Sequence, residues 1–319
     1  MTPGQLLLRY FHTPVGRVRR SFREGGPWAQ RVTEINRREM EAAALRLGPL
    51  PDYPRSVSAT LHLMTGRRFW YQTMFCLHSF AAASRATVNV VLYDDGSIDA
   101  DCTSRLSAMG PTVRIIRAQE LKQQLESFLP STRYPILRER WDNYPNIRKL
   151  IDVHLGSSGW KLVLDSDILF FRRPDLLFNW LSCPDRPLHA VDCTESYGYS
   201  REIMTKLAGF PIAPLVNVGL CGLRSEDLDW DKIEFWCNEL ITRERTNYFL
   251  EQALVAMLVA GKPTEVAPQR DYVTLPSRSE AEEPKAIMHH YVDTSKRWYF
   301  RYGWRHILDE RTRPRPLAR

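Results

Sequence analysis

Residues 160–171 read WKLVLDSDILFF, a hydrophobic stretch that two carboxylates, Asp165 and Asp167, interrupt. The apolar run from Trp160 to Leu164 is typical of a short buried strand. Alternation along an extended chain places both carboxylates on the same side. Two like charges in half-buried surroundings are costly unless a cation neutralises them, and oxygen ligands suit magnesium or manganese. The stretch therefore predicts a strand that ends in a metal site; a turn cap, or pairing with the two arginines that follow, is the alternative.

The segments before this stretch alternate between strand and helix patterns. Strand patterns cover residues 57–64, 87–93 and 112–117, and helical patterns cover residues 68–84 and 146–155. Strand and helix in alternation predict an α/β fold with a mostly parallel sheet covered by helices on both faces. Ligands of such sheets bind beyond the carboxyl ends of the strands. The pair Asp165 and Asp167 and the acidic turn Asp94-Asp95-Gly96-Ser97 both lie at strand ends of this kind.

The chain has 319 residues, 44% of them hydrophobic and 25% charged, as in an ordinary globular protein. This length accommodates one large α/β domain. We predict a basic, helical lead-in over residues 1–55, the α/β domain over residues 56–305 and a flexible basic tail over residues 306–319. Pro51 and Pro54 mark the end of the lead-in because proline does not continue a helix.

The formal charge is +7, with arginines concentrated at the two ends of the chain. These are Arg17, Arg19, Arg20 and Arg23 near the start and Arg311, Arg313, Arg315 and Arg319 near the end. Solvated ends explain such clusters, and attraction to anionic lipid headgroups is the alternative. No nucleic-acid-binding motif accompanies the charge, so we expect no nucleic-acid partner. Peripheral membrane contact through the basic termini stays open.

The six cysteines form no C-x-x-C pair and are irregularly spaced, which excludes zinc-finger and redox motifs. Most lie in apolar segments, where reduced, buried thiols are expected. No stretch reaches the roughly 18 apolar residues of a transmembrane helix, and the start of the chain lacks the apolar region of a signal peptide. We therefore predict a cytoplasmic protein, with the membrane periphery as the alternative.

Two motifs far apart in the chain resemble those of one enzyme family. The hydrophobic strand ending in Asp165-Ser166-Asp167 resembles its D-x-D motif, and His290, Lys296 and Trp298 match its pattern of His, five residues, Lys, one residue, Trp. The family is glycosyltransferase family 8, the glycogenin and lipopolysaccharide-galactosyltransferase group, which has the Rossmann-like GT-A fold. The resemblance implies that Asp165, Asp167 and His290 bind a divalent cation, Mn²⁺ or Mg²⁺.

Further segments match the family in the same order over residues 57 to about 300. By resemblance, the residues expected at the transferred sugar are Asp192, Asn217, Glu251 and Gln252. Those expected at the nucleotide or its diphosphate are Met64, Thr65, Asp94, Asp95, Lys149, Ser166, Gly219 and Lys296, with Arg148 as the alternative to Lys149. The chain departs from the family at Glu251, where Asp is usual, and at Asp293, where Gly is usual. Three of these matches also have a purely structural interpretation. A solvated helix face explains Lys149, an amphipathic helix explains residues 250–258, and an ordinary turn explains residues 94–97.

The resemblance implies a single catalytic domain that works as a metal-dependent glycosyltransferase. It would move a hexose from a nucleotide-diphosphate sugar, with a UDP-sugar as the family-based expectation, and retain the anomeric configuration. The acceptor is a saccharide, a lipid-linked molecule or a protein. Three alternatives are a sugar nucleotidyltransferase, a degenerate GT-A domain that only binds nucleotide or sugar, and a membrane-surface or nucleic-acid protein that uses its basic ends. The Gly-rich phosphate loop typical of nucleotidyltransferases is missing near the start of the chain.

Overall fold

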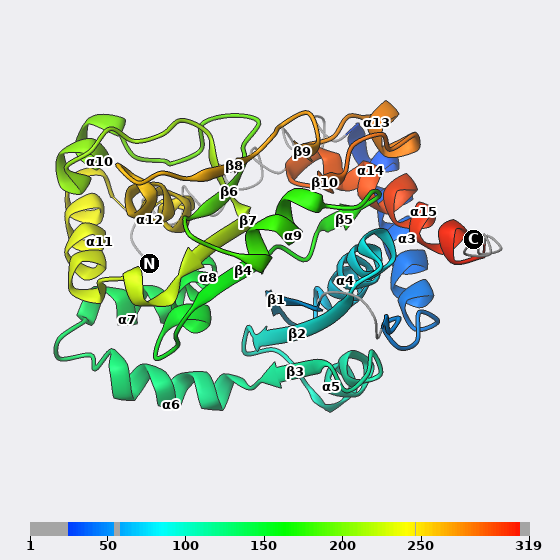
Figure 1. Ribbon diagram of the computed structural model, residues 1–319, viewed down its shortest axis with the longest axis horizontal. Helices are drawn as coiled ribbons and strands as arrows, with labels where there is room; N and C mark the ends of the chain where they lie inside the picture. Colours follow the sequence, from blue (N-terminus) through cyan, green and yellow to red (C-terminus); the bar gives the residue numbers. More distant parts are fainter. Residues whose placement is uncertain (1–24, 54–57, 246, 313–319) are drawn as a thin grey trace.

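A seven-stranded sheet in the order β3-β2-β1-β4-β7-β6-β8 forms the centre of the computed structural model, which describes residues 25–53, 58–245 and 247–312 (Figure 1). Its strands are β1 Ser58–Thr65, β2 Thr87–Asp94, β3 Val113–Ile116, β4 Trp160–Leu164, β6 Leu188–Val191, β7 Val216–Arg224 and β8 Glu265–Ala267. The α-helices are α3 Gly26–Ala44, α4 Trp70–Ser84, α5 Ala100–Ser107, α6 Ala118–Phe128, α7 Pro135–Asn143, α8 Pro145–His154, α9 Asp175–Ser182, α10 Arg201–Ala208, α11 Trp230–Glu244, α12 Leu250–Val259, α13 Arg278–Glu282, α14 Lys296–Trp298 and α15 Trp304–Thr312. Apart from the backbone of Arg311 in α15, the arginine clusters at the two ends lie outside the described part of the chain.

The expected α/β fold with a mostly parallel sheet is confirmed. Strands β3, β2, β1 and β4 are parallel neighbours, whereas β7 runs antiparallel to both β4 and β6. Because of this reversal, the start of β7 lies beside the carboxyl ends of its two neighbours: Leu164 pairs with Leu220, and Val191 pairs with Val216. Residues from three strands therefore meet at one edge of the sheet.

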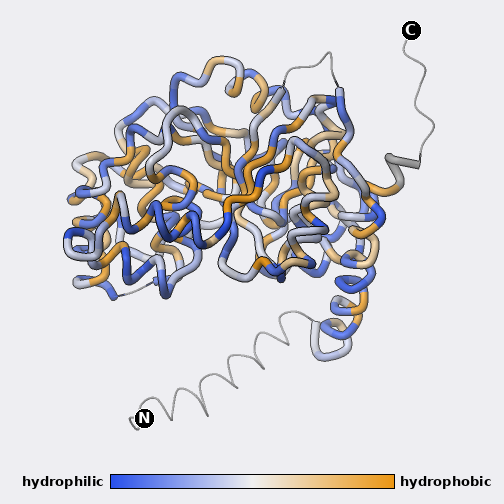
Figure 2. The backbone as a smooth tube through the Cα atoms, turned by 90° about the horizontal axis from the view of Figure 1, so that it is seen from below, coloured by the Kyte–Doolittle hydropathy of each residue, from blue (hydrophilic) through white to orange (hydrophobic). Residues whose placement is uncertain are grey.

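Alternation along the strands explains how helices cover both faces. On β1, Leu61 and Leu63 belong to the core cluster that includes α4, whereas His62 lines a small cavity together with Asp152 and Val153 of α8. Side chains at successive strand positions point to opposite faces, so α4 and α8 cover opposite sides of the sheet. Figure 2 shows the most hydrophobic segments running through the middle of the molecule. The predicted covering of both faces is thus confirmed.

A second, three-stranded sheet is a feature that the sequence patterns did not predict. It consists of β5 Ile168–Phe170, β10 Met288–His290 and β9 Tyr272–Thr274. Strand β10 is antiparallel to β5, with His290 opposite Ile168. This pairing brings a histidine near the end of the chain next to the acidic pair that precedes β5.

The two ends of the described chain pack together beside α4. Helix α3 buries Met40, Ala43 and Ala44 and lies against α4 and the short π-helix η4, Tyr299–Gly303 (Figure 1). Ile307 of α15 is also buried, so the first residues of the predicted tail belong to the packed structure. The proposed domain boundaries stay predictions. Among the described residues, no helix combines the length and apolar character needed to span a membrane.

Candidate functional site

The structure brings Asp165, Asp167 and His290 together at the carboxyl end of β4, a central strand of the main sheet. Asp165 follows β4, Asp167 precedes β5, and His290 ends β10. The His290 Nε2 atom lies 3.2 Å from Asp167 Oδ1 and 3.5 Å from Asp165 Oδ2. One ligand atom from each residue lies within 4.8 Å of the others. We call these three residues the acidic triad.

Unpartnered atoms in the acidic triad fit a bound cation. Asp167 Oδ1 and both ring nitrogens of His290 are buried and lack a hydrogen-bond partner of suitable alignment, despite the 3.2 Å approach. Buried polar atoms without a partner are costly and rare. Carboxylate oxygens and an imidazole nitrogen are ligands that manganese and magnesium accept. Among the described residues, this is the one group of acidic, histidine or cysteine side chains arranged for a metal.

The charges of the acidic triad shift the pKa values of its members in opposite directions. Burial alone lowers the pKa of His290, but the carboxylates of Asp167 and Asp165 raise it to about 9. Burial alone raises the pKa of both aspartates, but Lys149 and His290 hold that of Asp165 below its ordinary value. Lys296 and His290 do the same for Asp167. Both carboxylates are therefore ionised and suited to bind a cation.

Each aspartate of the acidic triad also contacts a lysine. Lys296 Nζ lies 2.7 Å from Asp167 Oδ2, and Lys149 Nζ lies 2.8 Å from Asp165 Oδ1. Lys149 further donates to Val218 O at 3.1 Å and lies 3.5 Å from Glu251 Oε1. Burial opposes the charged form of Lys149, yet the carboxylates of Asp165 and Glu251 raise its pKa. The site thus holds two ammonium groups next to its anions.

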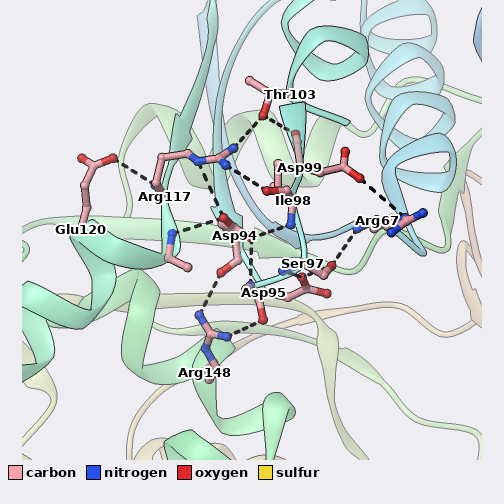
Figure 3. A network of polar contacts seen from close by, with 12 residues as sticks. Arg67, Asp94, Asp95, Ser97, Ile98, Asp99, Thr103, Arg117, Glu120 and Arg148 are labelled. Atoms are coloured by element: carbon pink, nitrogen blue, oxygen red, sulfur yellow. Dashed lines mark hydrogen bonds and ion pairs between the residues drawn. The ribbon is translucent and has the colours of Figure 1, made fainter. Parts of the chain in front are cut away.

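The sequence left open whether Lys149 or Arg148 contacts the nucleotide-sugar donor. In the structure the two side chains point in different directions. The Arg148 guanidinium contacts Asp152 Oδ2 at 3.0 Å. It also donates to the carbonyl oxygens of Asp94 at 2.8 Å and Asp95 at 2.6 Å (Figure 3). It thereby ties the acidic turn after β2 to helix α8. Only Lys149 of this pair lines the large cavity described below.

The two aspartates of the turn after β2 have different surroundings. The Asp94 carboxylate accepts hydrogen bonds from the backbone N–H groups of Gly96, Ile98 and Ala118, so it stabilises the turn (Figure 3). Asp94 does not line the large cavity, whereas Asp95 does. Because a fully engaged, buried carboxylate has little capacity for a ligand, Asp95 is the better candidate for contact with a nucleotide.

A cavity of about 1360 Å³ connects the predicted site residues, with Asp94 as the exception. At its β6 side, Gln252 Nε2 donates to Asp192 Oδ2 and to Val216 O, both at 2.9 Å. Asn217 Oδ1 accepts from the N–H of Gly219 at 2.9 Å. The predicted residues that line this cavity are Met64, Thr65, Asp95, Lys149, Asp165, Ser166, Asp167, Asp192, Asn217, Gly219, Glu251, Gln252, His290 and Lys296.

Two glycines make room for functional side chains. A Cβ atom on Gly219 would lie 2.1 Å from His290 Cε1, and one on Gly66 would lie 2.1 Å from the carboxylate of Asp95. Gly219 was predicted to contact the nucleotide-sugar donor. The structure adds that the absence of a side chain at Gly219 leaves room for the imidazole of His290. Gly66 was not predicted. Its position two residues after the strand pattern of residues 57–64 is a signal that could have identified it.

Other cavity residues were also missed from the sequence. Helix α3 contributes Gln30, Thr33, Glu34 and Arg37, and Phe69 lies just before α4. Tyr248 is 69% exposed and lies at the cavity near the start of α12. None of these residues belongs to a motif, so tertiary packing alone places them at the cavity.

Solved structures with the same fold are glycosyltransferases. The galactosyltransferase LgtC, in complex with donor and acceptor sugar analogs, matches with a TM-score of 0.52 and 14% identity over 79% of this chain and 95% of that chain. Mouse xyloside xylosyltransferase 1 matches with a TM-score of 0.50 and 12% identity over 73% of this chain and 97% of that chain. The sequence matches no protein-family model and no curated protein. At these identities the likeness establishes the fold, and the predicted GT-A architecture is confirmed.

Proposed function

We propose that this chain is a metal-dependent glycosyltransferase that moves a hexose from a nucleotide-diphosphate sugar to an acceptor. The observation that carries the proposal is the acidic triad, which lies with two lysines in a large cavity of a GT-A fold. LgtC, which shares the fold, was solved with donor and acceptor sugar analogs. This supports a nucleotide sugar, with a UDP-sugar as the first candidate, and a saccharide acceptor.

In this proposal, Asp165, Asp167 and His290 hold a divalent cation, either manganese or magnesium. The bound cation supplies Lewis-acid stabilisation of negative charge on the departing diphosphate. Lys296 and Lys149 add one positive charge beside each of the two aspartates. Positive groups that are already in place need no reorganisation when the charge of the leaving group develops.

Gln252 and Asp192 would position the sugar on the β6 side of the cavity. Both hydrogens of the Gln252 amide nitrogen are engaged by Asp192 and Val216, which leaves Gln252 Oε1 as the acceptor atom for a ligand. An amide is a weak nucleophile, so we propose retention through attack on the same face, without a covalent enzyme intermediate. Glu251 contacts Lys149 and would act by orienting that lysine.

A screen of nucleotide sugars for manganese-stimulated hydrolysis tests the proposal. We expect Asp165→Asn to abolish turnover of the donor that the screen identifies, with an unchanged thermal unfolding midpoint. Asp175→Asn serves as the control, because the Asp175 side chain is 70% exposed at the start of α9. Unchanged turnover in Asp165→Asn would reject the assignment.

A binding module without transfer activity is the second candidate. Glu251 and Asp293 depart from the family pattern, and Glu251 is engaged with Lys149. Such a module would bind UDP and manganese but show no donor hydrolysis even at high protein concentration. The cytoplasmic location and the peripheral membrane contact stay predictions, and cell fractionation tests them.

A further inference from the structure

Helix α3 presents a polar stripe to the large cavity. Gln30, Thr33, Glu34 and Arg37 all line it, and their spacing of three, four and seven residues puts them on one face of a helix. All four are half-buried. The opposite face is open to solvent, where Ile35 is 50% exposed. We call the four cavity-facing residues the α3 stripe.

The α3 stripe lies on the β1 side of the cavity. Arg37 stacks over the Tyr71 ring of α4 at 5.7 Å, and Arg301 Nη2 of η4 donates to Ala29 O at 3.0 Å. Phe69 and Met64, close to the end of β1, line the same cavity. In the sheet, β4 and β7 separate β1 from β6. The stripe is therefore on the far side of the acidic triad from the sugar-positioning pair Gln252 and Asp192.

The charges of the α3 stripe neutralise one another. Arg37 contacts Glu34 at 2.8 Å and Glu41 at 3.0 Å, and Glu34 also contacts Arg38 at 2.9 Å. The stripe adds no net positive charge for phosphate groups, which the acidic triad and Lys296 accommodate under the proposed function. It offers hydrogen-bonding groups, and Phe69, with 37% of its surface exposed, offers an aromatic face. A nucleoside, which has a flat base, amide edges and ribose hydroxyls, matches this chemistry.

We propose that helix α3 forms the outer wall of a nucleoside subsite, with Gln30 and Thr33 in contact with the base or ribose of the donor. This inference rests on the proposed function. The helix precedes residue 57, where the family resemblance begins. A segment outside the resemblance would thus contribute to the choice of nucleotide.

Two tryptophan substitutions on opposite faces of α3 test the inference. Thr33→Trp fills the space next to the stripe, whereas Ile35→Trp adds the same bulk to the solvent face. The probes are UDP, GDP and ADP with Mn²⁺, and inorganic pyrophosphate with Mn²⁺, measured by calorimetry. For Thr33→Trp we expect the best-bound nucleoside diphosphate to bind roughly ten- to a hundredfold more weakly, with unchanged pyrophosphate binding. Ile35→Trp leaves both affinities unchanged.

Thr33→Val is the milder variant and guards against misfolding, because it keeps the shape of the side chain and replaces the hydroxyl group with a methyl group. The Thr33 hydroxyl donates to Ala29 O at 2.8 Å within the helix and can still accept a hydrogen bond from a ligand. We expect Thr33→Val to weaken nucleoside diphosphate binding a few-fold, roughly the effect of one hydrogen bond, with normal unfolding behaviour. Equal loss of both probes in Thr33→Trp would mean a packing role for α3 and overturn the inference, as would unchanged nucleotide binding. A wild-type protein that binds none of the nucleoside diphosphates would reject the proposed function itself.

Discussion

His290 and His62 are both buried histidines at the central sheets, but their surroundings shift their pKa values in opposite directions. In the acidic triad, two carboxylates outweigh burial and raise the pKa of His290 to about 9. His62 lies on β1 in a small cavity of about 200 Å³, where its Nδ1 atom is 3.0 Å from the hydroxyl oxygen of Tyr93. Burial, together with the charge of Lys161, lowers its pKa to about 4.

The comparison shows that burial decides the state of a histidine unless neighbouring carboxylates outweigh it. Burial disfavours the charged form in both places. In the small cavity the imidazole of His62 is therefore neutral at neutral pH. The acidic triad gathers carboxylates at a strand end, and two lysines offset them. Carboxylates and lysines gathered in this way are typical of functional sites, whereas the charge that shifts the pKa of His62 is that of Lys161.

Asp167→Asn is expected to have the largest effect, because it removes an anion next to His290. The surroundings of His290 then differ less from those of His62. We expect transfer activity and manganese affinity to fall on the order of a thousandfold. Calorimetric titration with Mn²⁺ and the rate of donor hydrolysis measure the two effects. Asp185→Asn, at a side chain that is 60% exposed, should change neither. Manganese affinity that survives Asp167→Asn would remove this residue from the proposed metal site.

The free energy of unfolding, measured over a series of pH values, tests the His62 half of the comparison. The pKa of His62 is about 4 in the folded chain and 6.5 in the reference state, so the unfolded chain binds the proton more readily. The stabilising contribution is therefore present above pH 6.5 and is lost as the pH falls towards 4. At about 1.4 kcal/mol for each pH unit, the loss reaches about 3 kcal/mol.

His62→Asn removes this titration and keeps a hydrogen-bonding group near Tyr93. Urea unfolding of the variant between about pH 7.5 and about pH 5 should show a shallower loss of stability than that of the wild type. Part of the slope remains, because burial also lowers the pKa of His154, to about 3. Identical slopes in variant and wild type would contradict the description of His62.

Gly219→Ala sharpens the comparison by moving His290 without changing any charge. The added Cβ atom would lie 2.1 Å from the imidazole, so we expect manganese affinity to fall roughly ten- to a hundredfold. Gly222→Ala is the matched control in the same strand, where the added atom would lie 2.5 Å from Trp180. Both variants should lose stability, but only the first should lose metal affinity. Equal affinities in the two variants would argue against His290 as a ligand.

Asp293→Gly is expected to have the smallest effect. Asp293 has a φ of 41° and lines the cavity close to Lys296, in a backbone region that favours glycine. The substitution should stabilise the fold by about 1 kcal/mol and tighten UDP binding a few-fold, because it removes a carboxylate near the phosphate position. Thermal unfolding and calorimetry measure both. Weaker UDP binding would show that the Asp293 carboxylate contributes to the site.

Long regular elements were predictable because their patterns are local. Strands β1, β2 and β4 and helices α4 and α8 appear near the predicted residues, since continuous or periodic apolar residues indicate them directly. Strands β5, β9 and β10 have only three residues each, which is too short for a periodic pattern. The sequence also could not decide whether Arg148 or Lys149 contacts the nucleotide-sugar donor. The two basic residues are adjacent at the edge of one apolar helix face, and the sequence pattern fits both equally.

By itself the sequence determined the α/β class, the succession of the main strands and helices along the chain and the residue types of the acidic triad, because strand periodicity and motif spacing are properties of neighbouring residues. Only the tertiary structure decided that β10 pairs with β5, so that His290 faces the aspartates, and that helix α3 lines the cavity. The physical reason is that these contacts join segments more than a hundred residues apart. Their relative positions depend on how the whole core packs.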